Sequence, residues 1–256
     1  MEVSQLTFSY DKKTTIIHGI DCQIRPGKIT TVIGPNGCGK STLLGILVKN
    51  HQPYSGQVVV DGKELGEYKL KEFAQKLAVV HQQNEAPSDI TVEKLIGFGR
   101  LPHKTIFSKE RNEDREAVEW AITATNLQAM RDKTLSELSG GEKQRVWIAI
   151  SLAQKTPILF LDEPTTYLDI HFQFEILELI KHLNKDHQLT IVMVLHDINQ
   201  AIRYSDQIIA MKEGRIIKSG LPTEVISEEM MKQIYDVDVL IKEDKEIGLY
   251  VIPTGI

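Results

Sequence analysis

Cysteine is scarce in this chain: only Cys22 and Cys38 occur among 256 residues. The two cysteines match neither a disulfide framework nor a metal-binding pattern. No apolar run approaches the roughly 20 residues that a helix needs to cross a bilayer. The N-terminal stretch MEVSQLTFSYDKK also lacks the apolar core of a secretory signal. Together these absences favour a soluble protein of the cytoplasm.

A basic excess is missing as well. The chain has 30 lysine and arginine residues against 35 aspartate and glutamate residues, for a net charge of −5. Proteins that bind nucleic acids usually carry a basic stripe or excess, so no nucleic-acid partner is expected. With 41% hydrophobic residues the chain can bury a substantial core, either as one large domain or as one domain with a lobe.

Short apolar stretches alternate with helical patterns along the chain. Three of them, at Ile29–Ile33, Pro157–Pro164 and Leu189–Asp197, predict buried strands. A helix is expected over Ser41–Val48, and the pattern is mainly helical from 85 to 152. Buried apolar strands separated by helices predict an α/β fold with a parallel sheet.

The segment GPNGCGKST follows the first of these strands and opens a helix. Its glycine and lysine spacing is that of a P-loop, whose glycines let backbone N–H groups wrap phosphate oxygens. Lys40 would reach the β- and γ-phosphates, and the Ser41 hydroxyl would bind Mg²⁺. A purely structural glycine turn is the alternative, which the strand–loop–helix context disfavours. The predicted ATP-binding residues of this loop are Gly34, Pro35, Asn36, Gly37, Cys38, Gly39, Lys40, Ser41 and Thr42.

Acidic residues lie at the end of the second apolar stretch, and a histidine lies at the end of the third. Asp162 can hold Mg²⁺ through water, and Glu163 can orient the attacking water or accept its proton. Such a pair often only caps a helix, but its combination with the lysine loop favours catalysis. Because parallel strands deliver their carboxyl ends to one crevice, His196 can reach the γ-phosphate. By itself, His196 would be an ordinary loop histidine.

A second glycine motif, LSGGEKQR, begins at Leu138. The order Tyr10, P-loop, Gln82, LSGGEKQR, LFLDEP, TTYLD and His196 resembles that of the nucleotide-binding subunits of ATP-binding cassette (ABC) transporters, over essentially the whole chain. The resemblance implies one ABC ATPase domain over 1–256, a P-loop NTPase with a RecA-like core, an antiparallel β-subdomain and an inserted α-helical subdomain. Core and β-subdomain would comprise 1–85 and 156–220, the helical subdomain 86–155, and a C-terminal helix and hairpin 221–256.

The resemblance also implies a composite ATP site. In this family two cassettes dimerise head to tail, and each ATP lies between the P-loop of one subunit and the signature motif of the other. The signature residues Ser139, Gly140, Gly141 and Glu142 would therefore bind the partner's ATP, although glutamine is common in the family where this chain has Glu142. Tyr10 would stack on adenine, with a plain strand residue as the alternative. The other implied roles are catalysis for Lys40, Gln82, Glu163 and His196, Mg²⁺ coordination for Ser41, Gln82 and Asp162, and the D-loop for Asp169.

The stretch Ile90–His103 resembles ATPases of bacterial importers of ferric siderophores and cobalamin. This finer resemblance implies ATP-driven uptake of iron–siderophore complexes, with cobalamin or haem as alternative cargo and a non-transport ABC ATPase as a further alternative. Implied partners are integral-membrane permease subunits and, indirectly, an extracytoplasmic substrate-binding protein. The implied location is the cytoplasmic face of the membrane, as a peripheral protein. Arg100 and Phe107 are candidate permease contacts on the lobe surface, with lobe packing as the alternative for Phe107.

Overall fold

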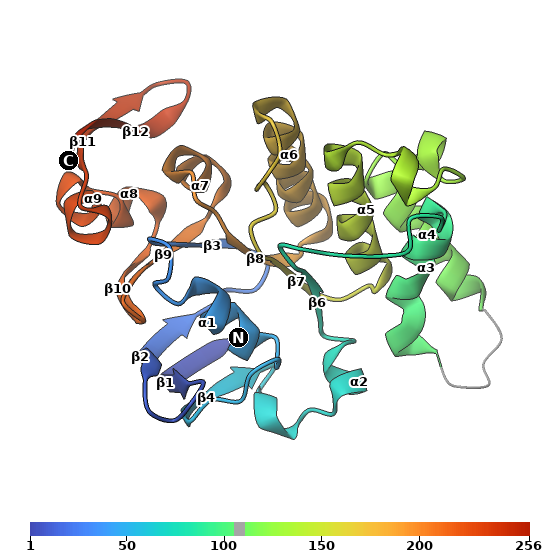
Figure 1. The fold of residues 1–256 in the computed structure, drawn as a ribbon, viewed down its shortest axis with the longest axis horizontal. Coiled ribbons are helices and arrows are strands. Elements are labelled where there is room, and N and C mark those ends of the chain that lie inside the picture. Colours follow the sequence, from blue (N-terminus) through green and yellow to red (C-terminus); the bar gives the residue numbers. More distant parts are fainter. Residues whose placement is uncertain (105–110) are drawn as a thin grey trace. The chain divides into compact units, whose positions relative to one another are not determined.

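The computed structural model describes residues 1–104 and 111–256, which form two compact units. Met1–Tyr68 and Thr190–Ile256 make up the first unit, and Lys69–Leu189 make up the second. Figure 1 labels most of the helices and strands of both. None of the helices in the described part of the chain has both the length and the apolar composition needed to cross a bilayer.

The first unit contains strands of two larger β-sheets. One sheet is antiparallel with the order β2-β1-β4-β5. The other has the order β10-β9-β3-β8, in which β3 is parallel to both β8 and β9. Every residue of β3 and β8 is buried, as expected for central strands of a parallel sheet. The strands are β1 (Glu2–Ser9), β2 (Thr15–Gln23), β3 (Ile29–Ile33), β4 (Ser55–Val60), β5 (Lys63–Glu64), β8 (Thr190–Val194), β9 (Gln207–Lys212) and β10 (Arg215–Gly220).

Helices and a C-terminal hairpin complete the first unit. The hairpin is fixed by Asn199, whose side-chain amide donates to the Val251 carbonyl at 3.1 Å and accepts from the Val251 N–H at 2.8 Å. Ser227 caps the helix before the hairpin by accepting a hydrogen bond from the Met230 N–H at 3.1 Å. The elements are α1 (Lys40–Leu47), η1 (Leu65–Glu67), α7 (Ile198–Tyr204), α8 (Pro222–Val225), α9 (Glu228–Tyr235), β11 (Asp238–Asp244) and β12 (Gly248–Gly255).

The second unit combines a parallel strand pair with a group of helices (Figure 1). β6 and β7 are paired in register from Leu77 opposite Ile158 to Val80 opposite Leu161. Helices α3, α4 and α5 pack on one another around fully buried side chains such as Ile96, Ile122 and Val146. The elements are α2 (Leu70–Phe73), β6 (Leu77–Val80), α3 (Val92–Gly97), η2 (Phe98–His103), α4 (Asn112–Ala124), η3 (Gln128–Met130), η4 (Leu135–Glu137), α5 (Gly140–Ala153), β7 (Ile158–Leu161) and α6 (Ile170–His187).

Arg100 is buried within the helical part of the second unit. Its side chain is 8% exposed, and its Nε lies 2.8 Å from Asp114 Oδ1. One terminal nitrogen also donates to the carbonyl of Ala153 at 2.8 Å. The predicted position of Arg100 on the lobe surface is therefore wrong, because this arginine joins η2, α4 and the end of α5. Phe107, the other candidate permease contact, lies outside the described residues.

Candidate nucleotide site

The P-loop connects β3 to α1 in the first unit. Gly34 has φ 151°, and a Cβ at this position would lie 2.3 Å from the Met211 carbonyl oxygen, so the tight approach requires glycine. Lys40, only 5% exposed, donates to the carbonyls of Gly34 at 2.8 Å and Pro35 at 3.1 Å. An ammonium has three N–H donors, so one remains for a phosphate oxygen. Burial raises the pKa of the Cys38 thiol in the same loop, which disfavours redox reactivity.

Tyr10 lies beside the P-loop, as an adenine-stacking residue would have to. Its hydroxyl is 3.1 Å from Thr42 Oγ1, and the tyrosine remains 63% exposed. Thr42 belongs to the first turn of α1 and is buried. The structure thus joins the predicted base-binding side chain to the predicted phosphate-binding loop within one unit.

His196 follows β8 in the first unit and is exposed. The neighbouring Leu195 N–H donates to the carbonyl of Val32 at 3.4 Å, so β8 ends next to the strand that leads into the P-loop. Asp197 then caps α7 by accepting from the Gln200 N–H at 2.8 Å. The P-loop and His196 therefore follow the carboxyl ends of adjacent parallel strands, which is the arrangement that brings functional side chains together in α/β sheets.

The predicted water-activating residue, Glu163, is held in place within the second unit. Its Oε2 accepts hydrogen bonds from Gln82 Nε2 at 2.7 Å and from Thr166 Oγ1 at 3.0 Å. Glu163 has φ 52°, a left-handed conformation that non-glycine residues rarely adopt and that concentrates at functional sites. The preceding Asp162 donates its N–H to Val80 at 2.9 Å. Gln82, Asp162 and Glu163 thus gather where β6 and β7 end.

The signature motif begins α5 in the second unit with a reciprocal capping box. Ser139 Oγ accepts from the Glu142 N–H at 3.3 Å, and the Glu142 carboxylate accepts from the Ser139 N–H at 2.7 Å. The second contact holds the pKa of Glu142 below its ordinary value. Because Ser139 Oγ acts as an acceptor here, its hydroxyl proton can still be donated to a phosphate. Serine followed three residues later by glutamate is the sequence signal for this box, and it explains why this chain can carry Glu142.

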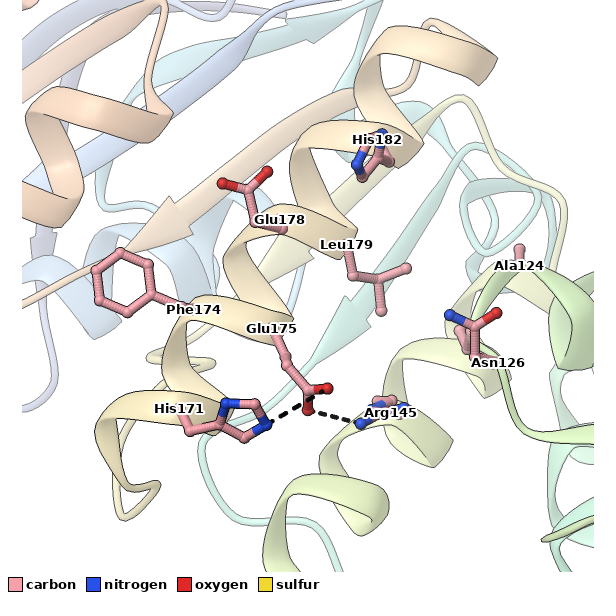
Figure 2. Close-up of a pocket in the computed structure, with 10 residues that line it drawn as sticks. Ala124, Asn126, Arg145, His171, Phe174, Glu175, Glu178, Leu179 and His182 are labelled. Atoms are coloured by element: carbon pink, nitrogen blue, oxygen red, sulfur yellow. Dashed lines mark hydrogen bonds and ion pairs between the residues drawn. The ribbon is translucent and has the colours of Figure 1, made fainter. Parts of the chain in front are cut away.

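One ion pair links α5 to α6, and a second contact within α6 involves the same glutamate. Arg145 donates to Glu175 at 2.7 Å, and His171 Nε2 lies 3.8 Å from the other carboxylate oxygen; Figure 2 shows both side chains directed at Glu175, at the edge of a pocket of about 550 Å³. Asp169 caps α6 by accepting from the Phe172 N–H at 3.1 Å. Ser139 and Asp169, the predicted signature and D-loop residues, are therefore the caps of two helices that an ion pair links.

The two signature glycines differ in their surroundings, and this difference predicts their tolerance to alanine. A Cβ on Gly141 would lie 2.3 Å from the Phe172 ring, whereas a Cβ on Gly140 would meet Leu168 at an ordinary 3.7 Å. Overpacking commonly costs about 1–3 kcal/mol, so Gly141→Ala should lower the melting temperature by roughly 2–10 °C in a chain of this size. Gly140→Ala, the matched control, should leave it nearly unchanged. Circular dichroism can measure both, and equal melting temperatures would contradict the packing argument.

Comparison with known proteins places this geometry in a family. The model of the ABC transporter family matches residues 17–166. The chain is 43% identical over 252 residues to the ferric enterobactin transport ATP-binding protein FepC of Escherichia coli (strain K12), covering 98% of this chain and 93% of FepC. It is 42% identical over 244 residues to the iron(3+)-hydroxamate import ATP-binding protein FhuC of Bacillus subtilis (strain 168), covering 95% and 90%. A solved dimeric ATP-binding cassette with ADP and Pi matches with a TM-score of 0.73 and 28% identity over 86% of this chain and 98% of that one. The chain belongs to the ABC transporter family.

Proposed function

We propose that this chain is the ATP-hydrolysing subunit of a bacterial ABC importer that takes up iron–siderophore complexes. The observation that carries the proposal is the full-length similarity to FepC and FhuC, whose names specify ferric enterobactin transport and iron(3+)-hydroxamate import. The pattern of Ile90–His103, which resembles that importer group, supports the same cargo. Cobalamin and haem are the alternative cargoes.

In the proposed reaction, the P-loop binds the phosphates of ATP and Lys40 balances their charge. Water attacks the γ-phosphorus, the bond to the β-phosphate oxygen breaks, and Glu163 takes the proton from the water. The hydrogen bonds from Gln82 and Thr166 support this role because they fix the carboxylate that must orient the water. His196 would donate a hydrogen bond to the γ-phosphate.

Mg²⁺ fits the donors that the sequence proposes for it. Ser41, Gln82 and Asp162 offer a hydroxyl, an amide oxygen and a carboxylate, which are the hard oxygen ligands that Mg²⁺ prefers. In the described part of the chain, no cluster of three histidine, cysteine or acidic residues could hold a metal. Mg²⁺ in nucleotide sites is commonly bound by one or two carboxylates together with phosphates, so the donor set suits it. When bound, the ion neutralises charge on the β- and γ-phosphates.

The proposed partners are a second copy of the chain and the permease of the importer. The similarity to a solved cassette described as dimeric supports a pair of cassettes. In the proposed head-to-tail pair, Ser139 Oγ and the start of α5 would bind the partner's γ-phosphate. Gln82 would sense the γ-phosphate of the ATP held by its own subunit and transmit closure to permease subunits at the cytoplasmic face of the membrane. An extracytoplasmic substrate-binding protein would deliver the cargo to the permease.

Uptake by a deletion strain tests the cargo. Removing the gene is expected to reduce uptake of radiolabelled ferric siderophore to background and to abolish growth on siderophore-bound iron as sole iron source. Uptake of labelled cobalamin and haem should be unchanged. Normal iron uptake in a strain whose other siderophore ATPases are also deleted would contradict the iron assignment, and a selective loss of cobalamin or haem uptake would favour that cargo instead.

A further inference from the structure

Three aromatic rings meet beside the P-loop in the first unit. Phe8 and His51 are stacked, with ring centroids 5.3 Å apart and planes inclined by 26°. Tyr10 stands nearly perpendicular to both, at 88° and 4.8 Å from Phe8 and at 83° and 5.3 Å from His51. Phe8 is 5% exposed, whereas Tyr10 is 63% exposed. Tyr10 is therefore the solvent-exposed ring of the cluster, and Phe8 and His51 pack against it.

His51 is fixed by the end of helix α1. Its N–H and that of Asn50 both donate to the Gly45 carbonyl, at 3.1 and 2.8 Å. Its ring lies close against the helix, because a Cβ on Gly45 would come within 2.6 Å of the imidazole. Helix α1 begins at Lys40. The helix that starts in the phosphate loop therefore also positions His51, which packs against Tyr10.

We propose that His51 is a positioning residue that orients the Tyr10 ring for the nucleobase, an inference that rests on the proposed stacking of adenine on Tyr10. The hydrogen bond between the Tyr10 hydroxyl and Thr42 Oγ1, 3.1 Å long, fixes the far end of the side chain. The edge-to-face contacts with Phe8 and His51, a favourable geometry for aromatic pairs, restrict rotation of the ring. A ring that is held in advance loses less conformational freedom when a base stacks on it. His51 therefore affects binding of the nucleobase through Tyr10, and not binding of the phosphates.

Comparing ATP with inorganic tripolyphosphate tests this role, because tripolyphosphate has the charges of ATP but no base. In calorimetric titrations of the full chain, His51→Ala is expected to raise the Kd of ATP about three- to tenfold, the effect of losing one such aromatic contact. The Kd of tripolyphosphate should stay within about twofold of the wild-type value. KM for ATP should rise with unchanged kcat, because stacking contributes equally to the ground and transition states of phosphoryl transfer.

Three further single variants and one double variant extend the test. His51→Phe keeps an aromatic ring and should restore wild-type ATP affinity. Gln52→Ala, at the exposed neighbouring position of the same loop, controls for disturbance of the loop and should change neither Kd. Gly45→Ala should weaken ATP binding selectively, because its Cβ displaces the imidazole although alanine favours the helix. Combining Gly45→Ala with His51→Ala should add little, since both act through the same ring.

The outcomes separate this inference from the proposed function. Equal weakening of ATP and tripolyphosphate binding by His51→Ala would overturn the inference, because His51 would then act through the phosphate loop. Unchanged ATP affinity in His51→Ala would also overturn it if Tyr10→Ala weakens ATP binding. Unchanged ATP affinity in Tyr10→Ala would contradict the adenine platform and the inference together. Failure of the wild-type chain to bind ATP would contradict the proposed function itself.

Discussion

Lys40→Ala is expected to abolish ATP turnover and to weaken ATP binding severely. The Lys40 ammonium is buried and held by the Gly34 and Pro35 carbonyls, at 2.8 and 3.1 Å, so that its charge is fixed at the phosphate loop. Loss of one preorganised electrostatic donor commonly costs about 10²–10³ in rate. Release of phosphate under saturating ATP and Mg²⁺ measures the loss of turnover, and calorimetry measures the loss of binding.

A second lysine of the same unit provides the control. Lys28 forms an exposed ion pair with Asp206 at 3.2 Å, and exposed pairs contribute little to stability. Lys28→Ala makes the same change in net charge as Lys40→Ala and should keep the wild-type rate and ATP affinity. Near-normal ATPase activity in Lys40→Ala would refute the assignment of the P-loop lysine.

Glu163→Gln should have a different effect, since it should stop hydrolysis while ATP still binds. Glutamine has nearly the shape of glutamate, and its amide oxygen can accept the hydrogen bonds that Gln82 and Thr166 donate to Glu163, at 2.7 and 3.0 Å. What is lost is the basic carboxylate, and positioned general bases contribute about 10²–10⁴ in rate. An uncleaved γ-phosphate should keep the proposed dimer closed, so size-exclusion chromatography with ATP should show dimers.

Glu116→Gln is the matched control for this experiment, because Glu116 is an exposed glutamate on α4 of the same unit. It should hydrolyse ATP at the wild-type rate and accumulate no dimer. If Glu163→Gln remains monomeric at saturating ATP, the sandwich of two cassettes is wrong. If it hydrolyses ATP at the wild-type rate, the role of Glu163 is wrong.

Local signals predicted the central elements well. The strand expected at Ile29–Ile33 is confirmed with these bounds, and the helix expected over Ser41–Val48 is α1, Lys40–Leu47. Both follow from a short, largely apolar run next to a glycine-rich turn. The predicted ABC family and α/β P-loop fold are confirmed by the family model and by the similar solved cassette. The division into three subdomains and the roles of the site residues stay predictions.

Side-chain contacts between residues that are far apart along the chain could not be predicted from the sequence. Arg100 was expected on the lobe surface as a candidate permease contact, but Asp114, 14 positions away, pairs with it in the interior. The hydrogen bond from Gln82 to Glu163 spans 81 positions, and the contact of His51 with Tyr10 depends on how α1 packs. None of these pairs has a signal within a local window. The capping box of Ser139 and Glu142 is different, because its spacing was visible in the sequence.

The most direct test of the central claim is the rate of radiolabelled ferric siderophore uptake in the deletion strain, complemented with either wild-type protein or Glu163→Gln. Both proteins should be present at equal levels at the membrane, since the substitution preserves the hydrogen bonds around residue 163. We expect wild-type protein to restore uptake and Glu163→Gln to leave it at background. Equal uptake with the two proteins, or no uptake with wild-type protein, would contradict the claim that ATP hydrolysis by this chain drives iron–siderophore import.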